Sequence, residues 1–292
     1  MKGIVLAGGL GTRLYPLTLS VSKQLLPVYD KPMIYYPVSV LMALNIRDIL
    51  IIATERDLPN YQEILRDGHQ WGINFEYKVQ SSPRGIADAF LLGEEFIGED
   101  SVILVLGDNI FVNGLRQINW QQIIYRAEQL GKATIFGYKV ENPREFGVIE
   151  FDDQFNPVSL QEKPETPKSN YCVIGLYVYP NKVVSYAKGL RPSARGELEI
   201  TDLNRIYLEN QELCVELLDE DAFWTDAGTY DGLLTAANYV REYENETDCQ
   251  VSCLEEIAYK NRWIGKAEMV SAFEKMKLTG YGRYLKKLID HS

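Results

Sequence analysis

The sequence predicts an α/β fold, in which a doubly wound, mostly parallel Rossmann-like sheet carries an added mixed β region and a helical C-terminal part. Short apolar runs alternate with segments of helical periodicity over the first half of the chain. Alternation of this kind indicates βαβ units and therefore parallel strand pairs. The run Ser101–Leu106 is apolar throughout, which is typical of a central strand covered on both faces.

The individual elements follow from these patterns. Strands are predicted at Lys2–Leu6, Asp48–Ala53, Phe75–Val79, Ser101–Leu106, Ala133–Tyr138 and Tyr171–Tyr179. Helices are predicted at Pro32–Leu44, Tyr61–Arg66, Ile86–Phe96, Gln121–Leu130, Tyr230–Tyr243, Leu254–Asn261, Lys266–Met276 and Tyr281–Ile289. Between Val148 and Leu218 proline and two-residue alternation are more frequent, so a mixed β region is expected there. Since no repeat or linker interrupts the chain, we expect a single domain over 1–292.

The composition excludes several classes of function. The chain has 292 residues with 30 Lys and Arg against 41 Asp and Glu, a net charge of −11, which argues against nucleic acid as a partner. No apolar run reaches the length of a transmembrane helix, so no membrane partner is expected. With only two histidines, a His-based metal site or a Ser-His triad is close to excluded. The four cysteines are expected to be thiols in a reducing cytoplasm: Cys172, Cys214, Cys249 and Cys253.

A glycine-rich loop directly follows the first predicted strand, over Leu6–Leu14. Gly8, Gly9 and Gly11 let backbone N–H groups approach a ligand closely, and successive N–H groups form an anion-binding nest. Arg13 lies inside this loop as a fixed cation. The spacing is neither that of a P-loop nor a complete dinucleotide fingerprint. The loop therefore indicates a phosphate site, with a tight strand-to-helix turn as the alternative.

A second basic segment, Ser22–Val28, begins about ten residues after the glycine loop. Lys23 lies there on a stretch bounded by proline, and we expect it to contact phosphate rather than solvent. For Lys31 a solvated side chain and a functional one are equally favoured.

Two aspartates follow short apolar runs and adjoin glycines: Asp108 in Leu106–Asn109, and Asp226 in Phe223–Thr229. In open α/β sheets ligands bind beyond the carboxyl ends of strands. Magnesium is usually held by one or two carboxylates together with substrate phosphates. Either aspartate alone could form an Asx-turn or cap a helix. Together with the glycine loop, they predict a Mg²⁺ site.

Two further segments carry the charges that an anionic acceptor requires. Glu162 and Lys163 end a strand-like run, and Arg195 precedes a predicted helix. Lys163 and Arg195 supply positive charge for a phosphate, while Glu162 can accept hydrogen bonds from sugar hydroxyls. Glu199 and Asp202 are interpreted as ordinary charges at a helix N-terminus.

Taken together, the motifs resemble the sugar-nucleotide pyrophosphorylases from residue 1 to about 290. The resemblance is carried by L-A-G-G-x-G-T-R-L at Leu6–Leu14, S-K-Q-L-L-P-V-Y-D-K-P-M at Ser22–Met33, Q-x-x-P-x-G at Gln80–Gly85, G-D-N at Gly107–Asn109, F-G-V at Phe146–Val148, E-K-P at Glu162–Pro164 and R-G-E-L-E-I-T-D at Arg195–Asp202. The second motif favours the thymidylyl branch of that family over the uridylyl branch.

The resemblance implies dTTP and glucose 1-phosphate as substrates, Mg²⁺ as cofactor, and the first step of dTDP-rhamnose synthesis. It implies nucleotide contacts at Leu6, Gly8, Gly9, Gly11, Thr12, Arg13, Lys23, Gln24, Gln80, Pro83, Gly85 and Asp108, with Gln80 and Gly85 on the thymine. It implies sugar-phosphate contacts at Asn109, Gly147, Glu162, Lys163, Val173 and Arg195, and metal ligands at Asp108 and Asp226. The catalytic set would be Arg13, Lys23, Asp108, Lys163 and Asp226. The chain would then comprise a nucleotide-binding half (1–147), a sugar-phosphate-binding half (148–228) and a helical part (229–292).

Departures from the family pattern occur without loss of a presumed metal or phosphate ligand. The chain has Trp224-Thr225-Asp226-Ala227-Gly228-Thr229 where W-L-D-T-G-T is usual, and Ile174 where threonine is usual. After G-D-N-I-F it continues Val112-Asn113-Gly114 rather than Y-G-H. These changes bear on sugar preference and regulation.

The expected reaction is in-line attack of the sugar phosphate on the α-phosphorus of dTTP. The attacking oxygen is already anionic, so catalysis would consist of positioning and charge neutralisation. Three alternatives stay open: the same chemistry with UTP or another sugar 1-phosphate, a non-catalytic regulatory homologue, and a dinucleotide-dependent oxidoreductase.

No catalytic motif falls after Asp226, so the motifs assign no chemical task to the C-terminal helices. Leu254, Ile257, Ala258 and Asn261 form one stripe of a helix, and Glu255 is expected on another face. The resemblance implies a homotetramer, with product-type feedback through a distinct site, and these helices are the expected subunit interface.

Overall fold

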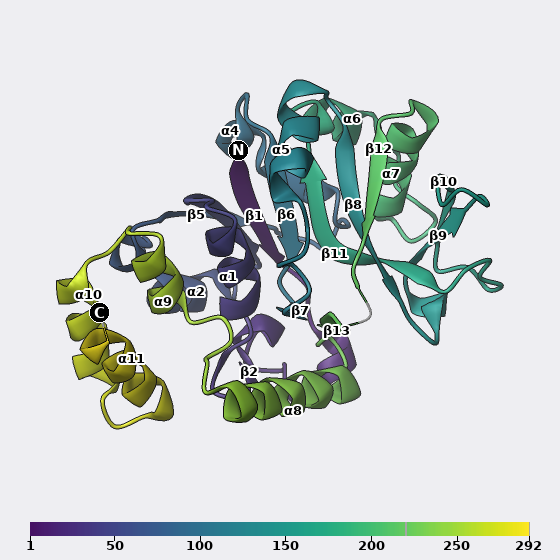
Figure 1. Cartoon of the computed structure of the whole chain (residues 1–292). Coiled ribbons are helices and arrows are strands. Elements are labelled where there is room, and N and C mark those ends of the chain that lie inside the picture. The colour runs from purple at the N-terminus through teal and green to yellow at the C-terminus, as the bar shows by residue number, and fades with distance from the viewer. Residues whose placement is uncertain (220, 292) are drawn as a thin grey trace. The chain divides into compact units, whose positions relative to one another are not determined.

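The computed structural model describes residues 1–219 and 221–291 (Figure 1). The chain forms two compact units. Each unit is assembled from stretches that are separated in sequence. The first comprises Met1–Leu6, Gln80–Leu106 and Asn113–Trp224, and the second comprises Ala7–Val79, Gly107–Val112 and Thr225–Ser292.

The first unit is built on a sheet in the order β10–β9–β11–β6–β1, with β8 also paired to β11 and β12 paired to β8. Its strands are β1 (Lys2–Ala7), β6 (Val102–Leu106), β8 (Ala133–Lys139), β9 (Gly147–Phe151), β10 (Pro157–Glu162), β11 (Tyr171–Tyr179) and β12 (Leu213–Leu217). β1 and β6 are parallel, as are β12 and β8, whereas β11 runs antiparallel to both β6 and β8. Residues Val102–Val105 of β6 are fully buried, as a central strand should be. The predicted combination of parallel strands and a mixed β region is confirmed.

The helices of the first unit are α3 (Asp88–Leu92), α4 (Glu94–Ile97), α5 (Trp120–Gln129), α6 (Val183–Gly189) and α7 (Ile200–Glu209). The single helix predicted over Ile86–Phe96 is wrong, because two short helices meet at Gly93. Glycine inside a helix is about 1 kcal/mol less favourable than alanine. Gly93 lies at φ −90° and ψ 5°, outside helical geometry, and thus separates the two helices.

The second unit contains the parallel pair β4 (Asp48–Ala53) and β5 (Asn74–Val79), together with α1 (Tyr35–Ala43), α2 (Leu58–Leu65) and β7 (Asn109–Val112). A short antiparallel hairpin joins β2 (Pro27–Val28) to β3 (Lys31–Pro32). The predicted start of a helix at Pro32 is therefore wrong by three residues, since Pro32 pairs with Pro27 and belongs to the hairpin. Short 3-10 helices lie at Thr12–Leu14 (η1), Lys23–Leu25 (η2) and His69–Trp71 (η3) in this unit, and at Pro143–Glu145 (η4) in the first.

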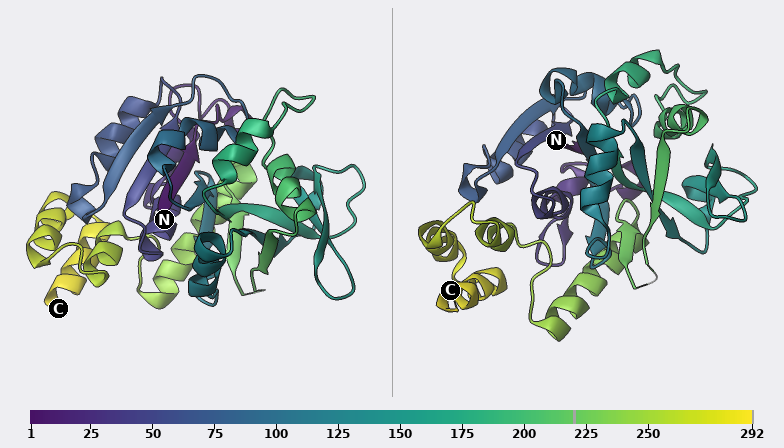
Figure 2. Two further views of the ribbon diagram at one scale, coloured as in Figure 1. Left: turned by 90° about the horizontal axis from the view of Figure 1, so that it is seen from above. Right: turned by 45° about the horizontal axis from the view of Figure 1, so that its top comes forward.

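The C-terminal part of the second unit is helical, as predicted. It consists of α8 (Tyr230–Thr247), α9 (Leu254–Lys260), α10 (Lys266–Met276) and α11 (Gly280–Asp290). α10 packs against α11, and the two lie side by side in both views of Figure 2. Leu254 and Ala258 are buried as the helical stripe predicts. Glu255 is buried too, against expectation, because it accepts hydrogen bonds from the Trp71 indole (3.0 Å) and the Tyr281 hydroxyl.

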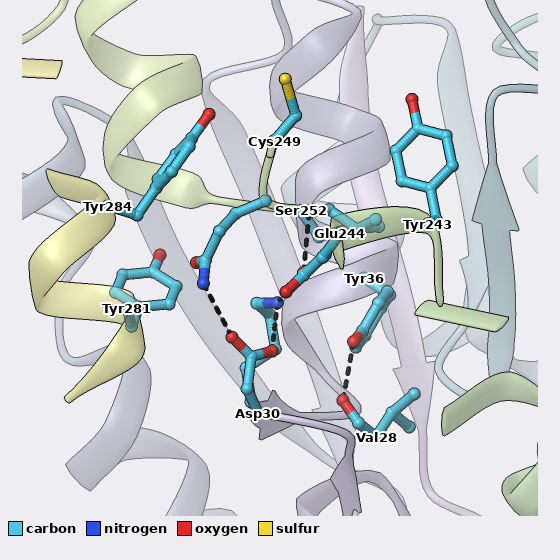
Figure 3. Close-up of polar contacts among 12 residues, drawn as sticks. Val28, Asp30, Tyr36, Tyr243, Glu244, Cys249, Ser252, Tyr281 and Tyr284 are labelled. Carbon is cyan, nitrogen blue, oxygen red and sulfur yellow. Dashed lines mark hydrogen bonds and ion pairs between the residues drawn. The ribbon is translucent and has the colours of Figure 1, made fainter. Parts of the chain in front are cut away.

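Lys31 proves to be a buried cation rather than a solvated one. Its ammonium contacts Asp30 and lies 3.0 Å from a carboxylate oxygen of Glu244 on α8. Figure 3 shows Tyr36 and Tyr281 flanking the Asp30 and Glu244 carboxylates, and the ammonium lies 5.6 Å and 5.9 Å from the centroids of these two rings. Burial and the Asp30 charge raise the pKa of Glu244 more than Lys31 lowers it. This network links the β2–β3 hairpin to α8 and α11.

In the part of the chain that the structure describes, no helix is both long and apolar enough to cross a membrane.

Candidate active site

The glycine loop of the second unit is shaped by Gly11. Gly11 has φ +65°, a conformation that glycine adopts without strain. The Thr18 hydroxyl donates to the Gly11 carbonyl over 2.7 Å. A Cβ at Gly11 would lie 3.2 Å from the Cβ of Lys23, so the loop and the second basic segment are in close contact. Gly9 and Thr12 are exposed, whereas Gly8 is buried.

Lys23 is held in a fixed position and is not a solvated side chain. It begins η2 and is only 8 % exposed. Its ammonium donates to Oδ2 of Asp108. The neighbouring Gln24 is also buried, and its Oε1 accepts hydrogen bonds from the hydroxyls of Ser22 (3.0 Å) and Tyr61 (3.1 Å). The segment after the glycine loop therefore presents Lys23 from a rigid support.

Asp108 and Asp226 converge next to Gly228. A Cβ placed on Gly228 would lie 2.7 Å from Oδ1 of Asp226, 3.3 Å from Oδ2 of Asp108 and 2.7 Å from Nη2 of Arg13. The two carboxylate oxygens are therefore at most about 6 Å apart. Arg13 donates to Oδ2 of Asp226 over 3.2 Å, and the backbone N–H of Ala227 donates to the Asp108 carbonyl over 2.9 Å. The four predicted charged residues of this unit thus form one cluster beside Gly228.

The two carboxylates differ in their electrostatics. Burial would raise the pKa of Asp108, but the Lys23 ammonium and a hydrogen bond from the Asn109 amide (3.1 Å) bring its pKa below the usual value. Burial and the neighbouring Asp108 carboxylate raise the pKa of Asp226 more than Lys23 and Arg13 lower it. Two carboxylates this close repel each other, and a bound cation would remove that repulsion.

The carboxylate pair fits a hard divalent cation that shares its coordination with phosphate. A protein usually binds Mg²⁺ through one or two carboxylates, and water and substrate supply the remaining ligands. Within residues 1–219 and 221–291 there is no group of three or more His, Cys, Asp or Glu side chains able to hold a metal.

The predicted acceptor residues of the first unit also come together. Gly147 on β9 is opposite Glu162 on β10 in the sheet register. A Cβ on Gly147 would lie 3.6 Å from Oε2 of Glu162, 3.7 Å from Cβ of Val173 and 3.1 Å from the Thr201 hydroxyl. Thr201 donates to the same Glu162 oxygen over 2.6 Å. Thr201 was not predicted to be a site residue, although it lies in the R-G-E-L-E-I-T-D motif.

Arg195 is held by a fork of carboxylates. Its Nε and Nη2 donate to the two oxygens of Glu199 over 3.1 and 2.8 Å, and Nη2 lies 3.4 Å from Glu162. The Ser193 hydroxyl donates to Oε1 of Glu199 over 2.7 Å. Glu199 stands at the N-cap of α7, but its carboxylate forms no cap there and is used on Arg195 instead. Its interpretation as an ordinary helix-terminal charge is thus incomplete.

Lys163 follows Glu162 with φ 44°, and its backbone N–H donates to the Phe146 carbonyl over 3.0 Å. This bond keeps the exposed Lys163 beside the turn that precedes Gly147. Asp202, by contrast, behaves as predicted, because it lies in the first turn of α7 and pairs with Arg205 at 2.7 Å.

The Gln80–Gly85 turn belongs to the first unit as well. Gln80 is buried and its amide Nε2 donates to Oδ2 of Asp88 over 3.1 Å. Pro83 is exposed at the tip. Gly85 has φ +97°, and a Cβ there would come within 2.4 Å of the Leu198 carbonyl oxygen. Only glycine fits this contact.

The sequence-predicted residues therefore gather in two sets. Arg13, Lys23, Asp108 and Asp226 form one in the second unit, with Asn109 beside Asp108. Gly147, Glu162, Val173 and Arg195 form the other in the first unit. Leu6, at the end of β1, is counted with the first unit, whereas the loop that follows it is in the second.

Comparison with known proteins gives a consistent result over the whole chain. The family model described as nucleotidyl transferase matches residues 2–243. The chain is 52 % identical over 289 residues to glucose-1-phosphate thymidylyltransferase of Neisseria gonorrhoeae, with 99 % of each chain covered. It is 48 % identical over 293 residues to the protein of the same name from Mycobacterium tuberculosis strain CDC 1551, with 100 % of each covered. A crystal structure from Bacillus anthracis, described under the same enzyme name and in complex with a sucrose, is 42 % identical with a TM-score of 0.77 and covers 83 % of this chain and 96 % of that one.

Proposed function

Because the chain belongs to the nucleotidyl transferase family, we propose that it transfers dTMP from dTTP to α-D-glucose 1-phosphate, releasing dTDP-glucose and pyrophosphate. The reaction class follows from the family, and the two substrates follow from full-length relatives at 45–52 % identity that carry one enzyme name. We propose that it supplies the first step of dTDP-rhamnose synthesis.

The observation that carries the proposal is the cluster of Arg13, Lys23, Asp108 and Asp226 beside a glycine loop. Two fixed cations and two carboxylates next to open backbone N–H groups suit a triphosphate with its metal ion. Each of the four residues forms an ion pair with another member of the cluster, Arg13 with Asp226 and Lys23 with Asp108. A non-catalytic homologue would be under no physical requirement to keep two repelling carboxylates so close together.

In the reaction an oxygen of the sugar phosphate forms a bond to the α-phosphorus of dTTP while the bond from that phosphorus to the β-phosphate bridging oxygen breaks. The electron pair leaves with pyrophosphate. No proton has to be removed from the attacking oxygen, so no general base is required. Arg13 and Lys23 would offset charge on the triphosphate and the departing pyrophosphate, and Lys163 and Arg195 would hold the sugar phosphate.

We propose Mg²⁺ as the cofactor, with Asp108 and Asp226 as its protein ligands. When bound, it neutralises charge on the phosphates and polarises them. The Lys23 ammonium and the Asn109 amide lower the pKa of Asp108, which favours the ionised form that binds a cation.

We further propose a homotetramer in the cytoplasm. The C-terminal helices carry exposed apolar side chains, among them Leu234 on α8 (61 % exposed) and Val270 on α10 (40 %). These side chains would lose their exposure to water if the C-terminal helices form the subunit interface. A cytoplasmic location agrees with the four cysteines, all of which are free thiols, and with the use of a nucleoside triphosphate. Product-type feedback through a distinct site is part of the same proposal.

The test is pyrophosphate release with a matrix of nucleoside triphosphates and sugar 1-phosphates. The expected result is fastest turnover with dTTP and glucose 1-phosphate, dependent on Mg²⁺ and abolished by EDTA. Faster turnover with UTP would show that the same chemistry takes place with uracil as the base. Thymine and uracil differ by one methyl group, which in an apolar pocket is worth only about 1–3 kcal/mol. Absence of pyrophosphate release with every pair would point to a non-catalytic homologue.

A further inference from the structure

We propose that Asp88 is a positioning residue for base selection: it fixes the Gln80 amide so that its oxygen faces the nucleotide, and the enzyme thereby accepts bases with an N3–H and rejects cytosine. The inference rests on the proposed function, in which Gln80 contacts the base.

Asp88 orients the amide because of what a carboxylate can and cannot do. Nε2 of Gln80 donates to Oδ2 of Asp88 over 3.1 Å, and the two residues are only 6 % and 2 % exposed. An Arg84 nitrogen lies 3.7 Å from the other oxygen of Asp88, as expected for an ionised carboxylate. An ionised carboxylate only accepts hydrogen bonds. A flipped amide would set oxygen against oxygen in a buried place, so only the NH₂ edge of Gln80 can face Asp88.

The other edge of the amide is left available. Among the described residues no group donates a hydrogen bond to Oε1 of Gln80. This atom is also not completely enclosed by the protein. It is therefore an accessible acceptor whose chemical identity is set by Asp88.

The backbone around the pair is held rigidly. The N–H of Leu198 donates to the Arg84 carbonyl over 2.7 Å, and the N–H of Ala87 donates to the Leu198 carbonyl over 3.2 Å. Gly85 lies against Leu198 so closely that no side chain fits between them. Asp88 begins α3 directly after this fixed turn. Its carboxylate therefore cannot move far to accommodate a flipped amide.

A fixed acceptor distinguishes pyrimidines by their N3 position. Thymine and uracil carry a hydrogen on N3 and can donate to Oε1. Cytosine has a lone pair on N3 and would face Oε1 acceptor to acceptor. Leaving such a pair of acceptors unmatched costs about 1–3 kcal/mol. The same amide cannot distinguish thymine from uracil, which differ only at C5.

The experiment compares dUTP, dCTP and dTTP as substrates of the whole enzyme with glucose 1-phosphate. In the Asp88→Asn variant the new amide can offer either edge, so Gln80 can turn over at little cost. We expect the ratio of kcat/KM for dUTP over dCTP to fall by about tenfold or more. The ratio for dTTP over dUTP should not change. Arg84→Ala, which removes the exposed cation but leaves the Gln80–Asp88 bond, is the matched control and should keep both ratios.

An unchanged ratio of dUTP to dCTP in Asp88→Asn would overturn the inference. A parallel fall of the dUTP/dCTP and dTTP/dUTP ratios would also overturn it, because it would indicate a general loss of structure. Should the variant not fold, the wild-type enzyme still offers a test, because equal use of dUTP and dCTP would overturn the inference. Failure of the proposed function is separate, because it would show as absence of product from dTTP in the wild type.

Discussion

Asparagine substitutions at Asp108 and Asp226 should both abolish turnover but differ sharply in their effect on stability. Both variants lose a predicted metal ligand, so we expect kcat to fall by orders of magnitude in each. Both variants also remove the repulsion between the Asp108 and Asp226 carboxylates. For oxygens at most about 6 Å apart, this repulsion is of the order of 3 kcal/mol at an effective dielectric constant near 20. Since this gain is common to the two variants, it cancels when they are compared.

The remaining difference comes from the cation that each carboxylate serves. Asp108 is bonded to Lys23, and the two side chains are only 14 % and 10 % exposed. Removing one partner of a buried pair leaves an uncompensated charge and typically costs about 3–5 kcal/mol. Asp226 is bonded to Arg13, which is 51 % exposed, and an exposed pair is worth about 0–1 kcal/mol. Asp108→Asn should therefore be less stable than Asp226→Asn by about 2–5 kcal/mol.

The assay is thermal unfolding of both variants in EDTA, without nucleotide, beside pyrophosphate release with Mg²⁺. A difference of 2 kcal/mol corresponds to about 3 °C in Tm for a chain of 292 residues. Equal Tm values would refute the electrostatic reasoning, and so would a lower Tm for Asp226→Asn. Full activity of either variant at low Mg²⁺ would remove the metal assignment.

Three further predictions concern the acceptor residues and the thiols. Glu199→Gln should raise the KM for glucose 1-phosphate about tenfold with little change in the KM for dTTP, because Arg195 loses its paired carboxylate. Steady-state kinetics with each substrate varied in turn measure the two KM values, and a change confined to dTTP would contradict the prediction. Lys163→Ala should likewise act mainly on glucose 1-phosphate, and an effect on dTTP alone would show that Lys163 serves the nucleotide. Burial raises the pKa of the Cys172 thiol to about 12, so iodoacetamide at pH 8 should modify the exposed Cys249 and spare Cys172 until the protein is unfolded. Peptide mass spectrometry measures the labelling, and equal labelling of the two cysteines in the native state would contradict the prediction.

Most elements of the fold could be predicted because their patterns are local. β4, β11 and α10 begin and end at the predicted residues, since each is a continuous run bounded by polar residues, glycine or proline. The errors arose where tertiary structure overrides the local pattern. Pro32 is held in a hairpin, and Glu255 is buried because Trp71 and Tyr281, remote in sequence, donate to it. Neither partner can be identified from helical periodicity.

The candidate site was predictable in its residue types but not in its supporting contacts. Glycine, lysine and aspartate in the motifs indicated phosphate and metal chemistry. Thr201 on Glu162 and Asp88 on Gln80 join residues 39 and 8 positions apart, and no spacing rule connects them. Arg195 and Glu199 are four residues apart, so their pairing could have been anticipated from the sequence.

The central claim, transfer of dTMP to a sugar phosphate, is tested most directly by following the α-phosphorus. The enzyme would be incubated with Mg²⁺, glucose 1-phosphate and dTTP labelled with ³²P at the α-position, and the products separated. We expect the label to appear in dTDP-glucose, with one pyrophosphate released for each label transferred and none released without the sugar phosphate. Label in dTMP or dTDP, formed equally well without glucose 1-phosphate, would show hydrolysis and contradict the account.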